Sequence, residues 1–175
     1  DYGSSHELPF YDGENLAASG DVVVVSLTHR LNVLGFLDLS AIDDRYHRSA
    51  NASLQDLVAG VQRLQRNATQ VGGDPDNVML FGQSGGGGKI TAMLNSPLAR
   101  GLFHRAAIQS GSFARDALPQ ETSRRLGVSV IDTLGIDRSR VDDSTLVPYP
   151  DLLAAATTAT REVVASLPDA PRGMS

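Results

Sequence analysis

The sequence predicts an α/β fold in which a mostly parallel sheet is flanked by helices. Apolar runs of strand length alternate with longer stretches whose apolar residues recur at helical spacing, as in strand–helix–strand units. The first run, residues 22–27, begins with four valines in a row, and such a β-branched run is typical of a strand buried on both faces. A glycine-rich turn then joins the second run directly to a helix.

The first quarter of the chain is predicted to be loop, helix and strand in turn. Residues 1–13 are rich in Gly, Ser, Pro and Asp and read as loop. Residues 14–19 are predicted to form a short helix that ends at Gly20, a residue favoured at helix C-termini. The strand at 22–27 follows, and the polar stretch 43–49 is predicted to be a surface loop.

A long amphipathic helix is predicted over residues 51–70. Its apolar face is formed by Leu54, Leu57, Val58, Val61 and Leu64. Ser53 and Asp56 fit a capping box at its start, with Asn51 as the alternative first residue. The pair Gly72–Gly73 is predicted to end it.

Strands are predicted at 78–81 and 105–109, with a helix at 87–95 directly after the first of them. Two more helices are expected at 120–134 and 151–166, joined by a polar linker that contains proline.

We expect residues 1–175 to form a single, incomplete domain. Residues 1–115 would hold the sheet core, and 116–175 a helical segment. The chain starts at Asp1 rather than Met and ends in loop-like sequence, so we expect an internal piece of a longer chain. Its compartment and oligomeric state are left open.

Composition excludes several classes of function. The net charge of −5, without basic blocks, makes nucleic acid an unexpected partner. The absence of cysteine removes disulfides, thiolate metal sites and a cysteine nucleophile. No two histidines share a ligand-like spacing, so no metal or other cofactor is expected. No apolar run approaches the ~20 residues of a membrane span.

The strongest chemical signal is the G-x-S-x-G pattern at residues 82–86, between a predicted strand and a predicted helix. This is the setting of a nucleophile elbow, a sharp turn that exposes a serine hydroxyl. Gly82 and Gly86 are expected to approach each other too closely for a Cβ. The amide of Gly85, at the helix N-terminus, would face a developing oxyanion. Ser84 is therefore the candidate nucleophile.

A phosphate-binding loop is the main alternative for this glycine run. Lys89 follows glycines as in a Walker motif, but Ile90 stands where that motif needs Ser or Thr. The first glycine is also misplaced. The elbow is therefore favoured over a nucleotide-binding α/β domain.

The ordered motifs along residues 3–111 resemble the type-B carboxylesterases, which have the cholinesterase-like α/β-hydrolase fold. The bacterial para-nitrobenzyl-esterase kind is most similar. The matching stretches are 11–13 with 16–17, 21–25, 30–31, 35–37, 51–56, 72–78, 82–86, 102–106 and 109–111.

The resemblance implies a carboxylic ester hydrolase acting on a small-molecule ester through an acyl-enzyme. It assigns Ser84 as nucleophile and Gly85 as one oxyanion donor. Relatives usually have Glu and Ala where this chain has Gln83 and Gly85. Their remaining oxyanion donors come from a glycine-rich loop that would precede Asp1.

Two further assignments come from the resemblance. Ser110 corresponds to a second serine near the site, with a plain strand-end turn as the equal alternative. Arg30 and Asp56 are expected to pair. Charges that are nearly buried need partners, so removing one would cost about 3–5 kcal/mol.

None of the four histidines is expected to be the catalytic base. Hydrolases of this fold run Ser, acid, His along the chain, and only His104 follows Ser84. No Asp or Glu lies between Gly85 and Phe103, so the acid and the base would lie outside residues 1–175.

A non-catalytic adhesion protein on the same fold, as in the neuroligin-like branch, is the alternative function. Such proteins lack the nucleophile, so the presence of Ser84 in an intact elbow favours the hydrolase.

Overall fold

The computed structural model describes residues 9–111 and 118–167, which fall into two compact units. The sheet unit comprises residues 9–31 and 53–111, and the helical unit residues 32–52 and 118–167. The helical unit is therefore discontinuous in sequence. The expectation of a single domain stays a prediction.

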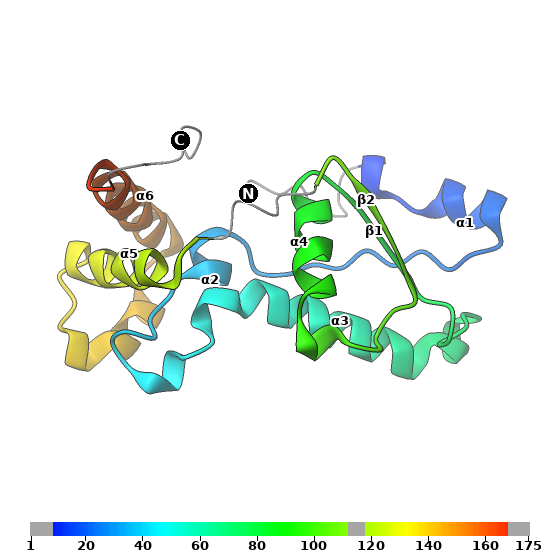
Figure 1. Ribbon diagram of the computed structural model, residues 1–175, viewed down its shortest axis with the longest axis horizontal. Helices are drawn as coiled ribbons and strands as arrows, with labels where there is room; N and C mark the ends of the chain where they lie inside the picture. Colours follow the sequence, from blue (N-terminus) through cyan, green and yellow to red (C-terminus); the bar gives the residue numbers. More distant parts are fainter. Residues whose placement is uncertain (1–8, 112–117, 168–175) are drawn as a thin grey trace. The chain divides into compact units, whose positions relative to one another are not determined.

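The sheet unit contains two parallel strands, β1 (Met79–Gln83) and β2 (Arg105–Gln109), in register from Met79 opposite Arg105 to Gln83 opposite Gln109. The other elements of the unit are η1 (Pro9–Tyr11), α1 (Glu14–Gly20), α3 (Ala52–Asn67), η4 (Ala68–Val71), α4 (Gly85–Leu94) and η5 (Pro97–Ala99) (Figure 1). The predicted strand–turn–helix at 78–95 is thus confirmed as β1 followed directly by α4.

The core of the sheet unit lies between α3 and β1. The predicted apolar face of α3 supplies half of its buried residues, and Val61 is fully buried. The residues of this core are Leu57, Val58, Val61, Val78, Met93 and Ala99, with Leu27, Leu54, Leu64, Leu80, Leu102 and Phe103 against them. The left-handed Gly72 ends η4, as the sequence predicted for the end of this helical stretch.

The strand predicted at 22–27 is not part of the sheet. These residues run as an extended segment, with Val22, Val23 and Val25 between 44% and 48% exposed (Figure 1). The prediction of burial on both faces is wrong for this reason: in the described part of the chain, only β1 and β2 form a ladder. A β-branched run becomes a buried strand only where neighbouring strands supply hydrogen bonds.

The capping box predicted for the long helix is also wrong. Ser53 lies inside α3, fully buried, with its Oγ 3.0 Å from Nδ1 of His29. Asp56 turns to Arg30 instead of to the helix terminus. Both side chains bind the segment that precedes the helix in sequence, because tertiary partners displaced the local cap.

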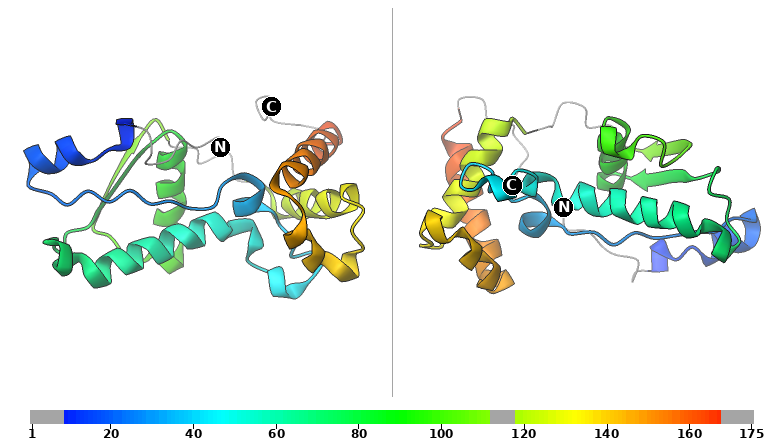
Figure 2. Two further views of the ribbon diagram at one scale, coloured as in Figure 1. Left: turned by 180° about the vertical axis from the view of Figure 1, so that it is seen from behind. Right: turned by 90° about the horizontal axis from the view of Figure 1, so that it is seen from below.

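The helical unit is built around α5 (Gln120–Thr133) and α6 (Tyr149–Ala165), which pack against each other (Figure 2). Its short elements are α2 (Asn32–Phe36), η2 (Asp44–Tyr46), η3 (Ser49–Asn51) and η6 (Arg138–Leu146). The predicted surface loop at 43–49 thus contains short helical turns, and α2 was not predicted. Ile131 of α5 is fully buried.

A charged cluster joins two segments of the helical unit that are far apart in sequence. Arg45 pairs with Asp43 at 2.7 Å and with Asp142 at 3.0 Å, and Tyr46 also hydrogen-bonds Asp142. The pKa of Asp142 is lowered by the Tyr46 hydrogen bond and by Arg45.

Across the part of the chain that the structure describes, none of the helices has both the length and the apolar character needed to cross a bilayer.

Candidate active site

Ser84 lies at the carboxyl end of β1 and is the residue immediately before α4. Its backbone has φ 51° and ψ −118°, and few residues other than glycine adopt a positive φ. The residue is exposed. Within the described part of the chain its hydroxyl has no hydrogen-bond partner, so this geometry presents a free Oγ at the strand end.

The glycines around Ser84 permit this turn, although not in the symmetrical way the sequence suggested. A Cβ at Gly82 would lie 2.7 Å from the carbonyl carbon of Gly86, so Gly82 is required. A Cβ at Gly86 would meet no atom within 4 Å. The predicted crowding is therefore one-sided and is wrong for Gly86.

The first turn of α4 supplies unpaired amides beside Ser84. The carbonyl of Ser84 accepts from the amide of Gly88 at 3.0 Å, as in a first helical turn. The amides that precede Gly88 in the helix have no intrahelical acceptor, and Gly85 is the first of them. The backbone N–H of Gly85 thus stands at the positive end of a helix, next to the serine.

The end of β2 lies beside the elbow. The amide of Ser84 donates to the carbonyl of Gln109 at 2.8 Å, and Ser110 follows with φ 52°. Each strand ends in the same tripeptide, Gln-Ser-Gly, at 83–85 and 109–111. The structure therefore brings Ser110 next to the elbow by backbone contact.

Two neutral glutamines and one lysine lie near the elbow in the structure. Gln83 and Gln109 are opposite each other in the sheet register, and both are exposed. Lys89, in the second turn of α4, is half-buried, and burial lowers its pKa. Nowhere in residues 9–111 and 118–167 do three His, Cys, Asp or Glu side chains gather as a metal site would require.

The histidines of the described residues are engaged elsewhere. Nδ1 of His104 accepts from the amide of Val78, at the amino end of β1, whereas Ser84 follows its carboxyl end. At ~3.3 Å per strand residue, the two ends are about 20 Å apart. His29 contacts Ser53, and Nδ1 of His47 lies 3.0 Å from the carbonyl of Asp44. His6 lies outside the described residues.

Arg30 and Asp56 form the expected ion pair. Nη2 of Arg30 lies 2.6 Å from Oδ1 of Asp56, while Nε and the backbone amide of Arg30 both donate to Oδ2, at 2.8 and 2.9 Å. The pKa of Asp56 is lowered, mainly by these side-chain hydrogen bonds. The Arg30 side chain is 54% exposed, however, so the expectation of nearly buried charges is wrong.

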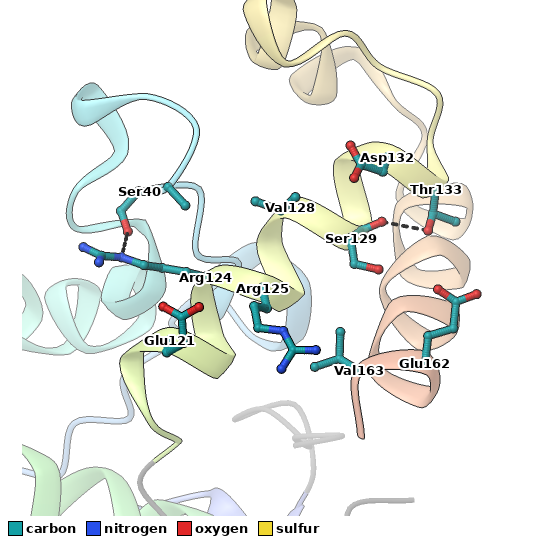
Figure 3. Close-up of a pocket in the computed structure, with 11 residues that line it drawn as sticks. Ser40, Glu121, Arg124, Arg125, Val128, Ser129, Asp132, Thr133, Glu162 and Val163 are labelled. Carbon is teal, nitrogen blue, oxygen red and sulfur yellow. Dashed lines mark hydrogen bonds between the residues drawn. The ribbon is translucent and has the colours of Figure 1, made fainter. Parts of the chain in front are cut away.

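An open cavity of about 870 Å³ lies in the helical unit, beside α5 (Figure 3). Charged side chains of that helix line it together with Ser40 and Glu162. Arg124 donates from Nε to Ser40, and Asp132 is paired with Arg138 outside the wall. No residue of the elbow lines this cavity.

Comparison with known proteins places this chain in a family. The family model described as "Carboxylesterase family" matches residues 1–152. The chain belongs to the carboxylesterase family. Its two-stranded sheet, elbow and helices are accordingly part of an α/β-hydrolase fold.

The relatives are much longer than this chain. Para-nitrobenzyl esterase of Bacillus subtilis (strain 168) is 41% identical over 148 residues, which cover 85% of this chain and 29% of that protein. Acetylcholinesterase of Gallus gallus is 45% identical over 112 residues, covering 63% of this chain and 14% of that one. This carboxylesterase-family chain thus spans less than a third of the length of the curated relatives it matches.

Solved structures give the same assignment. An esterase from anaerobic Clostridium hathewayi superposes with a TM-score of 0.86 at 43% identity, over 94% of this chain and 33% of that one. A thermophilic para-nitrobenzyl esterase gives 0.85 at 38% identity, over 92% and 32%.

Sequence reasoning found Ser84, Gly85 and Ser110 but missed Gln109 and Gly111 as neighbours of the elbow. Both act through their backbones, which carry no chemical signature in a sequence. The one available signal was the repeated Gln-Ser-Gly at the ends of successive strands.

Proposed function

We propose that the protein is a carboxylic ester hydrolase that uses Ser84 as its nucleophile. The observation that carries this proposal is the backbone of Ser84, a non-glycine residue with positive φ between a parallel strand and the helix that follows it. Strain of this kind costs about 1–3 kcal/mol and is typically retained where function needs it. Family membership supports the same reaction class.

In this proposal, Oγ of Ser84 attacks the ester carbonyl and a tetrahedral intermediate forms. Its oxyanion accepts a hydrogen bond from the N–H of Gly85, which points out of the N-terminus of α4. The alcohol leaves, the acyl group stays on Ser84, and water then releases the acid. The general base is a histidine, oriented by an acid, and both are supplied from outside residues 1–175. The reaction uses no metal or organic cofactor.

The substrate class is a small-molecule ester. The relatives above carry the names of esterases, which supports this class. Gln83 makes this elbow neutral at the position that precedes the nucleophile, where the resemblance to the type-B carboxylesterases implies a carboxylate. We infer that this site attracts a cationic ester less than a site with that carboxylate would.

Labelling with a fluorophosphonate tests the proposal in the protein expressed from its complete reading frame. Mass spectrometry should find the label on Ser84, and Ser84→Ala should lower ester turnover by several orders of magnitude. The matched control is Ser19→Ala, an exposed serine of α1, which should label at the normal rate. A label on Ser110 would refute the assignment of the nucleophile. No label at all would favour the adhesion protein.

A further inference from the structure

We propose that the strand-end turn formed by Gln109, Ser110 and Gly111, here called the second turn, orients the oxyanion donor of the active site. Gly111 is its key positioning residue. The proposal rests on the proposed function, because it concerns the peptide bond that joins Ser84 to Gly85.

The first observation concerns the amide side of Ser84. Its N–H donates to the carbonyl of Gln109 at 2.8 Å, one residue beyond the last pair of the β1–β2 ladder. At this point the chain has already left the strand, since Ser84 has φ 51°. The last hydrogen bond of the ladder, made by the residue of the second turn that still belongs to β2, thus holds the N-terminal side of the nucleophile.

The second observation concerns the carbonyl side. Gly111 is buried, and a Cβ placed on it would lie 2.5 Å from the carbonyl oxygen of Ser84. It would lie equally close to the Cα of Gly87, in the first turn of α4. The backbone of Gly111 is therefore packed directly against the backbone of the elbow, with no side chain between them.

Planarity of the peptide bond converts this contact into an effect on the donor. The carbonyl of Ser84 and the N–H of Gly85 belong to one rigid peptide unit and point in opposite directions. A contact that fixes the Ser84 oxygen therefore fixes the direction of the Gly85 N–H. The amide of Gly88 donates to the same oxygen at 3.0 Å and also helps to fix the orientation of this peptide unit.

Backbone strain explains why such support is needed. Ser84 and Ser110 both have positive φ, at 51° and 52°. Each costs a non-glycine residue of the order of 1–2 kcal/mol, so each would relax to negative φ without neighbours that prevent it. The contacts between the second turn and the elbow keep both serines at positive φ.

The test compares Gly111→Ala with Gly20→Ala in the protein expressed from its complete reading frame. At Gly20 the nearest atom to an added Cβ is 3.4 Å away, on the flexible side chain of Val22. Gly111→Ala should lower kcat about 10- to 100-fold with KM nearly unchanged, because a misdirected oxyanion donor loses part of the 10²–10³-fold that one donor supplies. Affinity for a trifluoromethyl ketone, which needs the oxyanion donor, should fall by a similar factor. Gly20→Ala should change neither quantity.

A folded Gly111→Ala protein with unchanged kcat and unchanged ketone affinity would overturn the proposal. If that variant does not fold, Ser110→Gly and Ser110→Ala decide, because both lack the hydroxyl and only glycine adopts the positive φ of residue 110 without a steric cost. The proposal expects a kcat several-fold lower for alanine than for glycine, and equal values would refute it. If the wild-type protein itself takes no fluorophosphonate label, the proposed function has failed and the positioning role fails with it.

Discussion

The φ of Ser84 is unfavourable for a residue with a side chain, and single glycines make it attainable. Gly82 must lack a Cβ because the backbone of Gly86 passes 2.7 Å from that position. Gly86 itself sits in the first turn of α4 with open space around it. Two glycines of one short motif thus have different physical roles, one steric and the other not.

This difference predicts opposite effects of alanine on stability. Gly82→Ala should lower the free energy of unfolding by about 1–3 kcal/mol, because the clash is with backbone that cannot move aside easily. Gly86→Ala should raise it by up to about 1 kcal/mol, since alanine is the better helix former. Urea unfolding of both variants measures this. A stabilising Gly82→Ala would show that the elbow is looser than described.

At the scale of elements, α3 is held by apolar packing along one face and by polar contacts at its first turns. Its apolar face packs on β1 and α4, while its first turns bind residues 29–30 through Ser53 and Asp56. The extended segment 22–30 has no strand partner among the described residues, so these polar contacts and Leu27 hold it to the helix. The ion pair is thus a connection between elements.

Asp56→Asn should lower the free energy of unfolding by about 1 kcal/mol at neutral pH. The pair is well aligned, but the Arg30 side chain is exposed. Its contribution to the free energy of unfolding is therefore that of a surface ion pair and not the larger one of a buried pair.

The pH dependence of this loss has a defined sign. The pKa of Asp56 is lower in the folded than in the unfolded state, so the pair stabilises the fold above the unfolded pKa of about 4. Its contribution is lost as the pH falls through the folded pKa. Unfolding curves of wild type and variant should therefore converge in acid. A difference that grows as the pH falls below about 4 would contradict this.

At the scale of the whole molecule, no histidine of the described residues is placed to act as a base for Ser84, the proposed nucleophile. Nδ1 of His104 accepts a hydrogen bond from the amide of Val78 at the amino end of β1. His29 contacts Ser53 in α3, and His47 contacts the carbonyl of Asp44. Without a base, a serine hydroxyl keeps its proton at neutral pH and reacts slowly. The helical unit supplies no catalytic histidine either, because its one described histidine is His47, which contacts Asp44.

We therefore expect the 175-residue chain alone to have no measurable esterase activity. The measurement is hydrolysis of an activated aryl ester by the purified chain and by its Ser84→Ala variant, and the two should agree. Turnover by the wild-type chain well above that of the variant would mean that a base lies within these residues.

The sequence by itself determined the elements whose signals are local. Helical periodicity placed α3, α5 and α6, and the apolar runs placed β1 and β2. The elbow was also predictable, because a serine between glycines at a strand–helix junction has few physical solutions.

Only the tertiary structure decided which neighbours these elements have. Residues 22–27 have the composition of a buried strand but join no ladder among the residues that the structure describes. Ser53 has the sequence context of a helix cap, yet its side chain binds His29. Gly111 looks like an ordinary turn residue, and its contact with the carbonyl of Ser84 is visible only in three dimensions. The reason is common to all three: pairing and close backbone approach depend on residues distant in sequence, whereas periodicity and turn chemistry depend on adjacent ones.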